Sequence, residues 1–213
     1  MSYVFEILPS LLSGASITLQ VFALVLVLSI PLGIAVAFLM QVHFKPLNWL
    51  INIYIWIMRG TPLLLQLIFI YYVLPSIGIR LDRMPAAVIA FTLNYAAYFA
   101  EIFRGGIVAI PKGQYEAAKV LKFTPWQTVR YITLPQVTKL VLPSVFNEVM
   151  TLVKDTSLVY ALGVSDLILA SRTAANRDAS LAPMFLAGAI YLILIGLVTL
   201  IAKQVEKKFS YYK

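Results

Sequence analysis

The chain has 213 residues, of which 61% are hydrophobic and only 12% are charged, and its mean hydropathy is +0.89. A soluble domain carries roughly a quarter charged residues, so the composition excludes a soluble globular protein and indicates that the lipid bilayer surrounds most of the chain. The formal net charge is +8 and there are no cysteines. The absence of cysteine excludes disulfides and cysteine-bound metals. In a membrane protein a surplus of Lys and Arg usually lies in cytoplasmic loops, so the positive charge does not indicate nucleic-acid binding.

Five apolar segments are long enough to cross a hydrocarbon core about 30 Å thick, which needs roughly 20 helical residues. In chain order they cover about 17–40, 50–74, 85–110, 139–163 and 181–202, and Arg59-Gly60-Thr61-Pro62 interrupts the second. No Lys or Arg precedes Lys45, so we expect the first segment to be a retained span rather than a cleaved signal peptide. The sequence therefore predicts an all-α membrane protein with five transmembrane helices, and residues 1–213 are expected to form a single transmembrane domain.

The distribution of Lys and Arg predicts the orientation of these spans. If the C-terminus is cytoplasmic, the inner segments hold ten basic residues and the outer segments hold four, while Arg59, Arg104 and Lys154 lie within or at the edges of spans. Cytoplasmic loops carry an excess of Lys and Arg, so we expect the N-terminus outside and the C-terminus in the cytoplasm. The segment between the third and fourth spans is then the largest cytoplasmic feature.

That cytoplasmic segment, residues 112–135, is amphipathic and contains two predicted helices. Residues 116–121 favour a first helix, and Thr124-Pro125-Trp126-Gln127 has the order of an N-cap, a first-turn proline and a capping-box partner for a second. Pro135 is expected to end the second helix before the next span begins. The two helices, joined at residues 122–123, could lie on anionic lipid or dock onto a partner protein, and the residues alone leave both open.

The same segment resembles the EAA loop of bacterial ABC importer permeases. Glu116-Ala117-Ala118 is followed at the family's spacing by Ile132-Thr133-Leu134-Pro135, and the one departure is Lys122, where the family has glycine. Glycine would adopt a left-handed turn there at low cost, whereas lysine loses roughly 1 kcal/mol, so either the turn differs or the strain is tolerated. Segments 59–62, 94–106 and 154–158 resemble the polar amino acid uptake branch of the family.

The resemblance implies a subunit that works with partners. The helix that would insert into a groove of a dimeric cytoplasmic ABC-type ATPase contains Tyr115, Glu116, Ala117, Ala118 and Leu121. A second permease copy or a sister permease would complete the path, an extracytoplasmic amino-acid-binding protein would deliver the substrate, and the assembly would lie in the bacterial cytoplasmic (inner) membrane. ATP and Mg²⁺ would be bound by the ATPase, because the nearest phosphate-loop match, residues 106–112, has proline at the required second glycine.

Polar side chains within the spans are the candidate substrate site, because ionisable groups at bilayer depth mark a substrate pathway or a buried pair. A zwitterionic amino acid needs donors for its carboxylate and acidic groups for its ammonium, which suits a small polar or basic amino acid held by the third and fourth spans. The predicted substrate-binding residues are Thr61, Asn94, Tyr98, Glu101, Glu148, Asp155 and Ser157. Among them, Thr61 and Ser157 suit the carboxylate, and Glu101 and Glu148 suit an ammonium or a cationic side chain.

The sequence leaves alternatives open for the charged residues of the spans and for the class of function. Glu101 and Arg104, three residues apart, could neutralise each other, and Lys154 with Asp155 could be a charge pair at a helix break. A stand-alone secondary transporter or channel is the competing function, although five spans without a detectable repeat argue against it. A membrane hydrolase is disfavoured, because the only histidine lies far in sequence from the candidate nucleophile Ser165.

Overall fold

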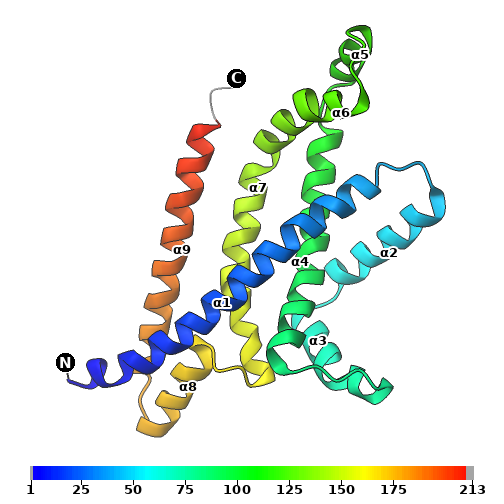
Figure 1. The fold of residues 1–213 in the computed structure, drawn as a ribbon. Helices are drawn as coiled ribbons and strands as arrows, with labels where there is room; N and C mark the ends of the chain where they lie inside the picture. Colours follow the sequence, from blue (N-terminus) through cyan, green and yellow to red (C-terminus); the bar gives the residue numbers. More distant parts are fainter. Residues whose placement is uncertain (1, 210–213) are drawn as a thin grey trace.

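The computed structural model describes residues 2–209 and is helical throughout, with no strand in that range (Figure 1). This confirms the predicted all-α class. The α-helices are α1 (Ser2–Leu39), α2 (Lys45–Gly60), α3 (Leu63–Ile68), α4 (Arg83–Val108), α5 (Lys112–Val120), α6 (Pro125–Thr128), α7 (Leu134–Asp155), α8 (Leu167–Asp178) and α9 (Ala182–Lys208). Two π-helical turns, Phe69–Val73 and Val129–Thr133, and two 3₁₀ segments, Leu74–Ile77 and Thr156–Leu162, lie between them.

The described residues contain three helices, α1, α4 and α9, that are each long and apolar enough to cross a bilayer. Two further helix pairs pass the same test only together, and both are bent: α2 with Leu63–Ile77 by 107°, and Pro125–Leu162 with α8 by 57°. Residues 2–209 therefore hold three to five candidate spans. The bend after α2 falls at the predicted interruption of the second segment, while α8 was not predicted as a separate helix.

Helix α1 is longer than the first predicted span, because it begins at Ser2, well before residue 17. In the added length, the Ser10 hydroxyl donates to the Ile7 carbonyl at 2.7 Å and the Ser16 hydroxyl donates to the Ser13 carbonyl at 3.0 Å. Such bonds to the preceding turn let serine remain within a helix.

The core forms where α1 crosses α4. Val21 and Val25 of α1 are fully buried against Phe91, Tyr95 and Phe99 of α4. Gly33 permits this approach, because a Cβ there would lie 2.6 Å from the Phe99 Cβ and 3.0 Å from the Ala96 carbonyl oxygen. Small residues at such crossings are how membrane helices achieve close van der Waals packing.

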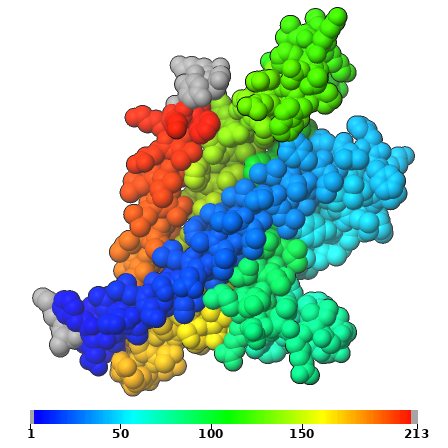
Figure 2. Space-filling view, in the orientation of Figure 1, coloured from blue at the N-terminus to red at the C-terminus, as the bar shows by residue number. Residues whose placement is uncertain are grey.

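The α5–α6 segment protrudes from one end of the molecule, and we call it the knob (Figures 1 and 2). Its two predicted helices are confirmed, and so is the capping box. The Thr124 hydroxyl accepts a hydrogen bond from the Gln127 backbone N–H at 3.2 Å, and the Gln127 side chain accepts one from the Thr124 N–H at 2.8 Å. These bonds satisfy two backbone donors at the start of α6.

The prediction that Pro135 ends the second helix is wrong. The chain continues from α6 through the π-helical turn into α7, and Pro135 lies in the first turn of α7. Within an α-helix, a proline ring clashes with the carbonyl four residues earlier. Here the Leu134 N–H donates to the Val129 carbonyl five residues back, and the wider π turn accommodates the proline without a break.

The left-handed turn expected for glycine is present at Lys122, whose φ is 57°. The Phe123 N–H donates to the Ala118 carbonyl and the Lys122 N–H to the Lys119 carbonyl, both at 2.9 Å. These two bonds form a Schellman motif at the end of α5, so position 122 is the site where glycine is most favourable. The backbone strain predicted for lysine is therefore tolerated rather than avoided.

Replacing Lys122 by Gly should stabilise the knob by about 1 kcal/mol, because glycine adopts the left-handed region without a steric cost. Thermal unfolding in detergent would show an increase in Tm of a few degrees. The matched control is Lys119→Gly, which places glycine inside α5 and should lower the Tm instead. A lower Tm for Lys122→Gly would show that the lysine side chain contributes more than its backbone strain costs.

Candidate functional site

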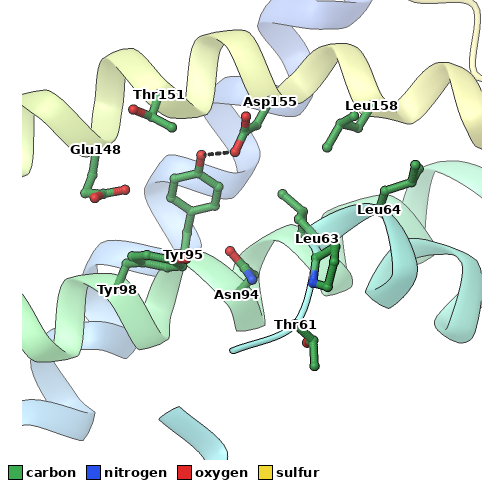
Figure 3. Close-up of a pocket in the computed structure, with 11 residues that line it drawn as sticks. Thr61, Leu63, Leu64, Asn94, Tyr95, Tyr98, Glu148, Thr151, Asp155 and Leu158 are labelled. Atoms are coloured by element: carbon green, nitrogen blue, oxygen red, sulfur yellow. Dashed lines mark hydrogen bonds between the residues drawn. The ribbon is translucent and has the colours of Figure 1, made fainter. Parts of the chain in front are cut away.

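A cavity of about 420 Å³ lies between the break that separates α2 from α3 and the facing surfaces of α4 and α7 (Figure 3). Thr61, at the break, has the extended backbone angles that a residue before proline prefers, which turns the chain away from the α2 axis. The lining residues are Thr61, Pro62, Leu63, Leu64, Asn94, Tyr95, Tyr98, Glu148, Thr151, Asp155 and Leu158.

The α7 wall of the cavity is acidic. Glu148, Thr151 and Asp155 recur at helical spacing, so they project from one face. The Asp155 carboxylate accepts a hydrogen bond of 2.8 Å from the Tyr95 hydroxyl. Glu148 has no hydrogen bond or ion pair to any residue within 2–209. None of the described lining residues is Lys, Arg or His, so this wall offers two carboxylates without a lining base to neutralise them.

The α4 wall is amide and aromatic. Tyr95 is buried between Phe91 and Phe99, which leaves its hydroxyl directed across the cavity to Asp155. Tyr98 carries the Arg59 guanidinium over its ring, 5.2 Å from the centroid. The α4 wall therefore presents two tyrosines: Tyr95 is held by its bond to Asp155, and the ring of Tyr98 is held by Arg59 at the end of α2.

The structure brings five of the seven predicted substrate residues together: Thr61, Asn94, Tyr98, Glu148 and Asp155. The other two, Glu101 and Ser157, do not line this cavity in the described part of the chain. Their roles in substrate binding stay predictions.

Glu101 has the neutralising partner that its spacing from Arg104 suggested. Two Arg104 nitrogens donate to its carboxylate, at 2.9 and 2.7 Å, and an Arg59 nitrogen lies 3.7 Å away. The alternative pair of Lys154 with Asp155 is absent from the ion pairs of residues 2–209. Lys154 is exposed, whereas Asp155 faces the cavity and bonds to Tyr95.

Sequence reasoning missed two polar lining residues, Tyr95 and Thr151. Thr151 had a signal, because it lies three residues after Glu148 and four before Asp155 and so shares their face. Tyr95 had none, because a tyrosine next to Asn94 in an aromatic-rich span is equally suited to the core, where its ring in fact lies. The apolar lining residues follow from the helix bend, which the sequence predicts only as an interruption.

The predicted ATPase-coupling residues all lie at the knob, on or directly after α5, but they face different ways. Glu116, Ala117 and Leu121 are exposed. Ala118 is buried, and Tyr115 packs against a cluster of Ile110, Val137 and Val141. Tyr115 and Ala118 thus hold the knob to its own chain, and the exposed three remain available to a partner.

The described residues contain no group of three or more His, Asp or Glu side chains that could hold a metal ion. The cavity lining provides two carboxylates, an amide, hydroxyls and the aromatic rings of Tyr95 and Tyr98.

Comparisons with known proteins agree over nearly the full length of the chain. Residues 29–211 match the family model described as binding-protein-dependent transport system inner membrane component. The arginine transport system permease protein ArtQ of Bacillus subtilis is 38% identical, with 95% of this chain and 94% of that protein aligned. The L-cystine transport system permease protein TcyB of the same organism is 34% identical, with 96% and 88% aligned.

The fold has a similar counterpart among solved structures. A chain from the crystal structure of an amino acid ABC transporter with histidines matches with a TM-score of 0.90 and 30% sequence identity. The alignment covers 97% of both chains.

Proposed function

Because the chain belongs to the family of binding-protein-dependent transport system inner membrane components, we propose that it forms part of the membrane path for a basic or polar amino acid. It is a permease subunit of an amino acid ABC importer and not an enzyme, and a separate subunit hydrolyses the ATP. ATP and Mg²⁺ belong to that subunit, and the permease itself carries no cofactor.

The observation that supports a cationic substrate is the pair of cavity carboxylates without a lining base. Glu148 is half-buried and has no hydrogen bond or ion pair to any described residue, so it can attract a substrate cation in a partly desolvated site. The Arg59 guanidinium, which lies over the Tyr98 ring, offsets part of this attraction. Two relatives agree with this direction, since one is named for arginine transport and a similar solved structure was obtained with histidines. Other relatives are named for cystine and glutamine, which are neutral polar amino acids.

The membrane arrangement we propose has five spans, an outer N-terminus and a cytoplasmic C-terminus, within the bacterial inner membrane. It treats each bent pair as one span, and residues 1–213 as one transmembrane domain. In support, the beginning of α1 lies near α8, at the opposite end of the molecule from the knob and the end of α9 (Figure 1). The basic residues of the knob and of the end of α9 then share the cytoplasmic side.

The assembly would contain a dimeric ATPase, a second permease copy or sister permease, and an extracytoplasmic amino-acid-binding protein. Purified complex in nanodiscs would be tested with L-arginine, L-lysine, L-histidine, L-glutamine and L-glutamate. We expect the basic amino acids to raise both the Tm and the ATPase rate most strongly. If none of the three does so, the cationic-substrate assignment is wrong, and stimulation by glutamine alone would assign a neutral polar substrate.

Charge reversal at Glu116, exposed on the knob, should weaken ATPase binding. A buried interfacial charge without its partner costs about 2 kcal/mol or more, so recovery of the ATPase with Glu116→Arg should fall at least tenfold. The measurement is a mild-detergent pull-down of the tagged permease from native membranes, with quantitative mass spectrometry. Glu6→Arg, exposed at the opposite end of the molecule, is the matched control and should recover the ATPase normally.

Two other outcomes of this pull-down are informative. Equal recovery with Glu116→Arg and wild type would show that Glu116 does not secure the contact. No ATPase with either protein would favour the alternative function, a self-contained secondary transporter or channel, which would move substrate on an ion gradient without ATP.

A further inference from the structure

Asn94, on the α4 wall of the cavity, uses both hydrogens of its side-chain amide away from the cavity. Its nitrogen donates to the Met58 carbonyl at 2.8 Å and to the side-chain oxygen of Gln66 at 3.0 Å. Both acceptors lie around the break after α2, and Asn94 itself is 4% exposed. If the Asn94 amide were flipped, its oxygen would face the oxygens of Met58 and Gln66 without a hydrogen between them, so the observed orientation is strongly preferred.

Gln66, on α3, is fixed in its own orientation by the same break. Its side-chain nitrogen donates to the Met58 carbonyl at 3.0 Å and to the Thr61 hydroxyl oxygen at 2.8 Å, and lies 3.2 Å from the Thr61 carbonyl oxygen. The Thr61 hydroxyl gives its hydrogen to the Ile57 carbonyl at 2.8 Å, so its oxygen is free to accept. The Gln66 oxygen is therefore left to face Asn94.

These bonds form a chain: the Met58 carbonyl accepts from the Gln66 amide nitrogen, and the Gln66 amide oxygen accepts from the Asn94 nitrogen. The group left at the end of the chain is the Asn94 side-chain oxygen. That oxygen accepts no hydrogen bond from any residue in the described range, and in Figure 3 it points into the space between α4 and α7. With the carboxylates of Glu148 and Asp155, it makes a third acceptor at the cavity. A ligand group that contacts it must donate, as an ammonium or guanidinium does.

Gln66 does not line this cavity. It lines a separate apolar pocket of about 560 Å³ between α2, α3 and α4, whose lining includes Phe69 and Ile89. A substrate in the acidic cavity therefore does not contact Gln66 directly. Gln66 can act on binding through Asn94 or through Thr61, whose hydroxyl it also contacts, and the double-mutant cycle below isolates the part that passes through Asn94.

We propose that Gln66 is a positioning residue that holds the Asn94 amide with its oxygen toward the substrate cavity, and so makes this position selective for a hydrogen-bond donor of the substrate. The inference rests on the proposed function, because it takes the cavity to be the substrate site. It assigns to the helix break a role in recognition, in addition to shaping the cavity wall.

The test is a double-mutant cycle between Gln66→Met and Asn94→Ala, read as KM and maximal rate of L-arginine uptake by proteoliposomes containing the complete importer. Methionine has a similar length but its sulfur is only a weak hydrogen-bond acceptor for Asn94, so we expect a roughly tenfold rise in KM and less than threefold loss of maximal rate. In the Asn94→Ala background, Gln66→Met should raise KM by less than twofold, because it has no amide left to orient. If the rise in KM of the double variant equals the product of the rises in the two single variants, the two residues act independently and the proposal is overturned.

Gln66→Glu is the conservative variant that separates positioning from general stability. A glutamate oxygen can still accept from Asn94, so its KM should stay within threefold of wild type even if the Tm falls. A tenfold rise with Gln66→Glu would contradict the proposal, and this holds whether or not the methionine variant can be purified. If Asn94→Ala itself leaves KM unchanged, the Asn94 oxygen does not contact the substrate and this inference fails. The cavity is rejected as the substrate site only if Glu148→Gln also leaves the arginine KM unchanged.

Discussion

Replacing Glu148 by Gln should abolish the preference for basic amino acids while preserving the fold. The variant keeps the shape of the side chain and removes the one cavity carboxylate that has no hydrogen bond or ion pair within the described chain. Losing the charge that pairs with a substrate cation in a desolvated site costs about 2 kcal/mol or more, which corresponds to roughly thirtyfold in affinity. The measurement is KM for L-arginine and for L-glutamine in the same proteoliposomes, and only the arginine value should rise strongly.

Glu101→Gln is the matched comparison, because this glutamate is already neutralised by Arg104 and lies close to Arg59. If Glu101 acts only within that cluster, its replacement should lower the Tm and change the arginine KM much less than Glu148→Gln. If Glu101 also contacts substrate, as its predicted role requires, the two variants will raise KM alike. An unchanged arginine KM in Glu148→Gln would contradict the cationic-substrate assignment at this cavity.

Replacing Gly106 by Ala should separate α4 from α7 near the knob and destabilise the protein. A Cβ at this buried position would clash with a Val141 methyl group and lie 3.1 Å from a Val137 methyl group. Valine side chains in helices have one strongly preferred rotamer, so neither methyl can easily move away. Overpacking of this kind costs about 1–3 kcal/mol. Thermal unfolding should show a fall in Tm of several degrees.

The adjacent glycine provides the control, because a Cβ at Gly105 meets no atom of the described chain within 4 Å. Gly105→Ala should therefore leave the Tm unchanged or raise it slightly, since alanine favours a helix. Adding Val141→Ala to Gly106→Ala should recover part of the loss by removing the clashing methyl. If the double variant is less stable than either single one, steric conflict with Val141 is not the cause.

The elements that the sequence predicts well are those whose signals are local. The capping box at Thr124 and Gln127 and the interruption before Pro62 each depend on neighbouring residues, and each is present. The misjudged features depend on context. A proline normally ends a helix, but a π-helical turn accommodates Pro135, and the serines before residue 17 remain within α1 by bonding to the preceding turn.

The site shows the same division. Helical spacing correctly places Glu148 with Asp155 and Asn94 with Tyr98, because each pair belongs to one helix. Spacing carries no information about contacts between helices. The bond from Tyr95 to Asp155 joins residues 60 positions apart, and that from Asn94 to Gln66 joins residues 28 apart. Neither follows from periodicity: the first depends on how α7 packs against α4, and the second on how α3 packs against α4.

The absence of a loop between the knob and the cavity has a mechanical consequence. The segment Pro125–Leu162 is helical from the knob to beyond Asp155, so it can act as a lever with the knob at one end and the cavity carboxylates near the other. At about 1.5 Å per residue, the stretch from Leu134 to Asp155 is roughly 30 Å long. A tilt of a few degrees about the knob would therefore move Asp155 away from Tyr95 far enough to break their hydrogen bond, so a force on the knob would change the geometry of the cavity.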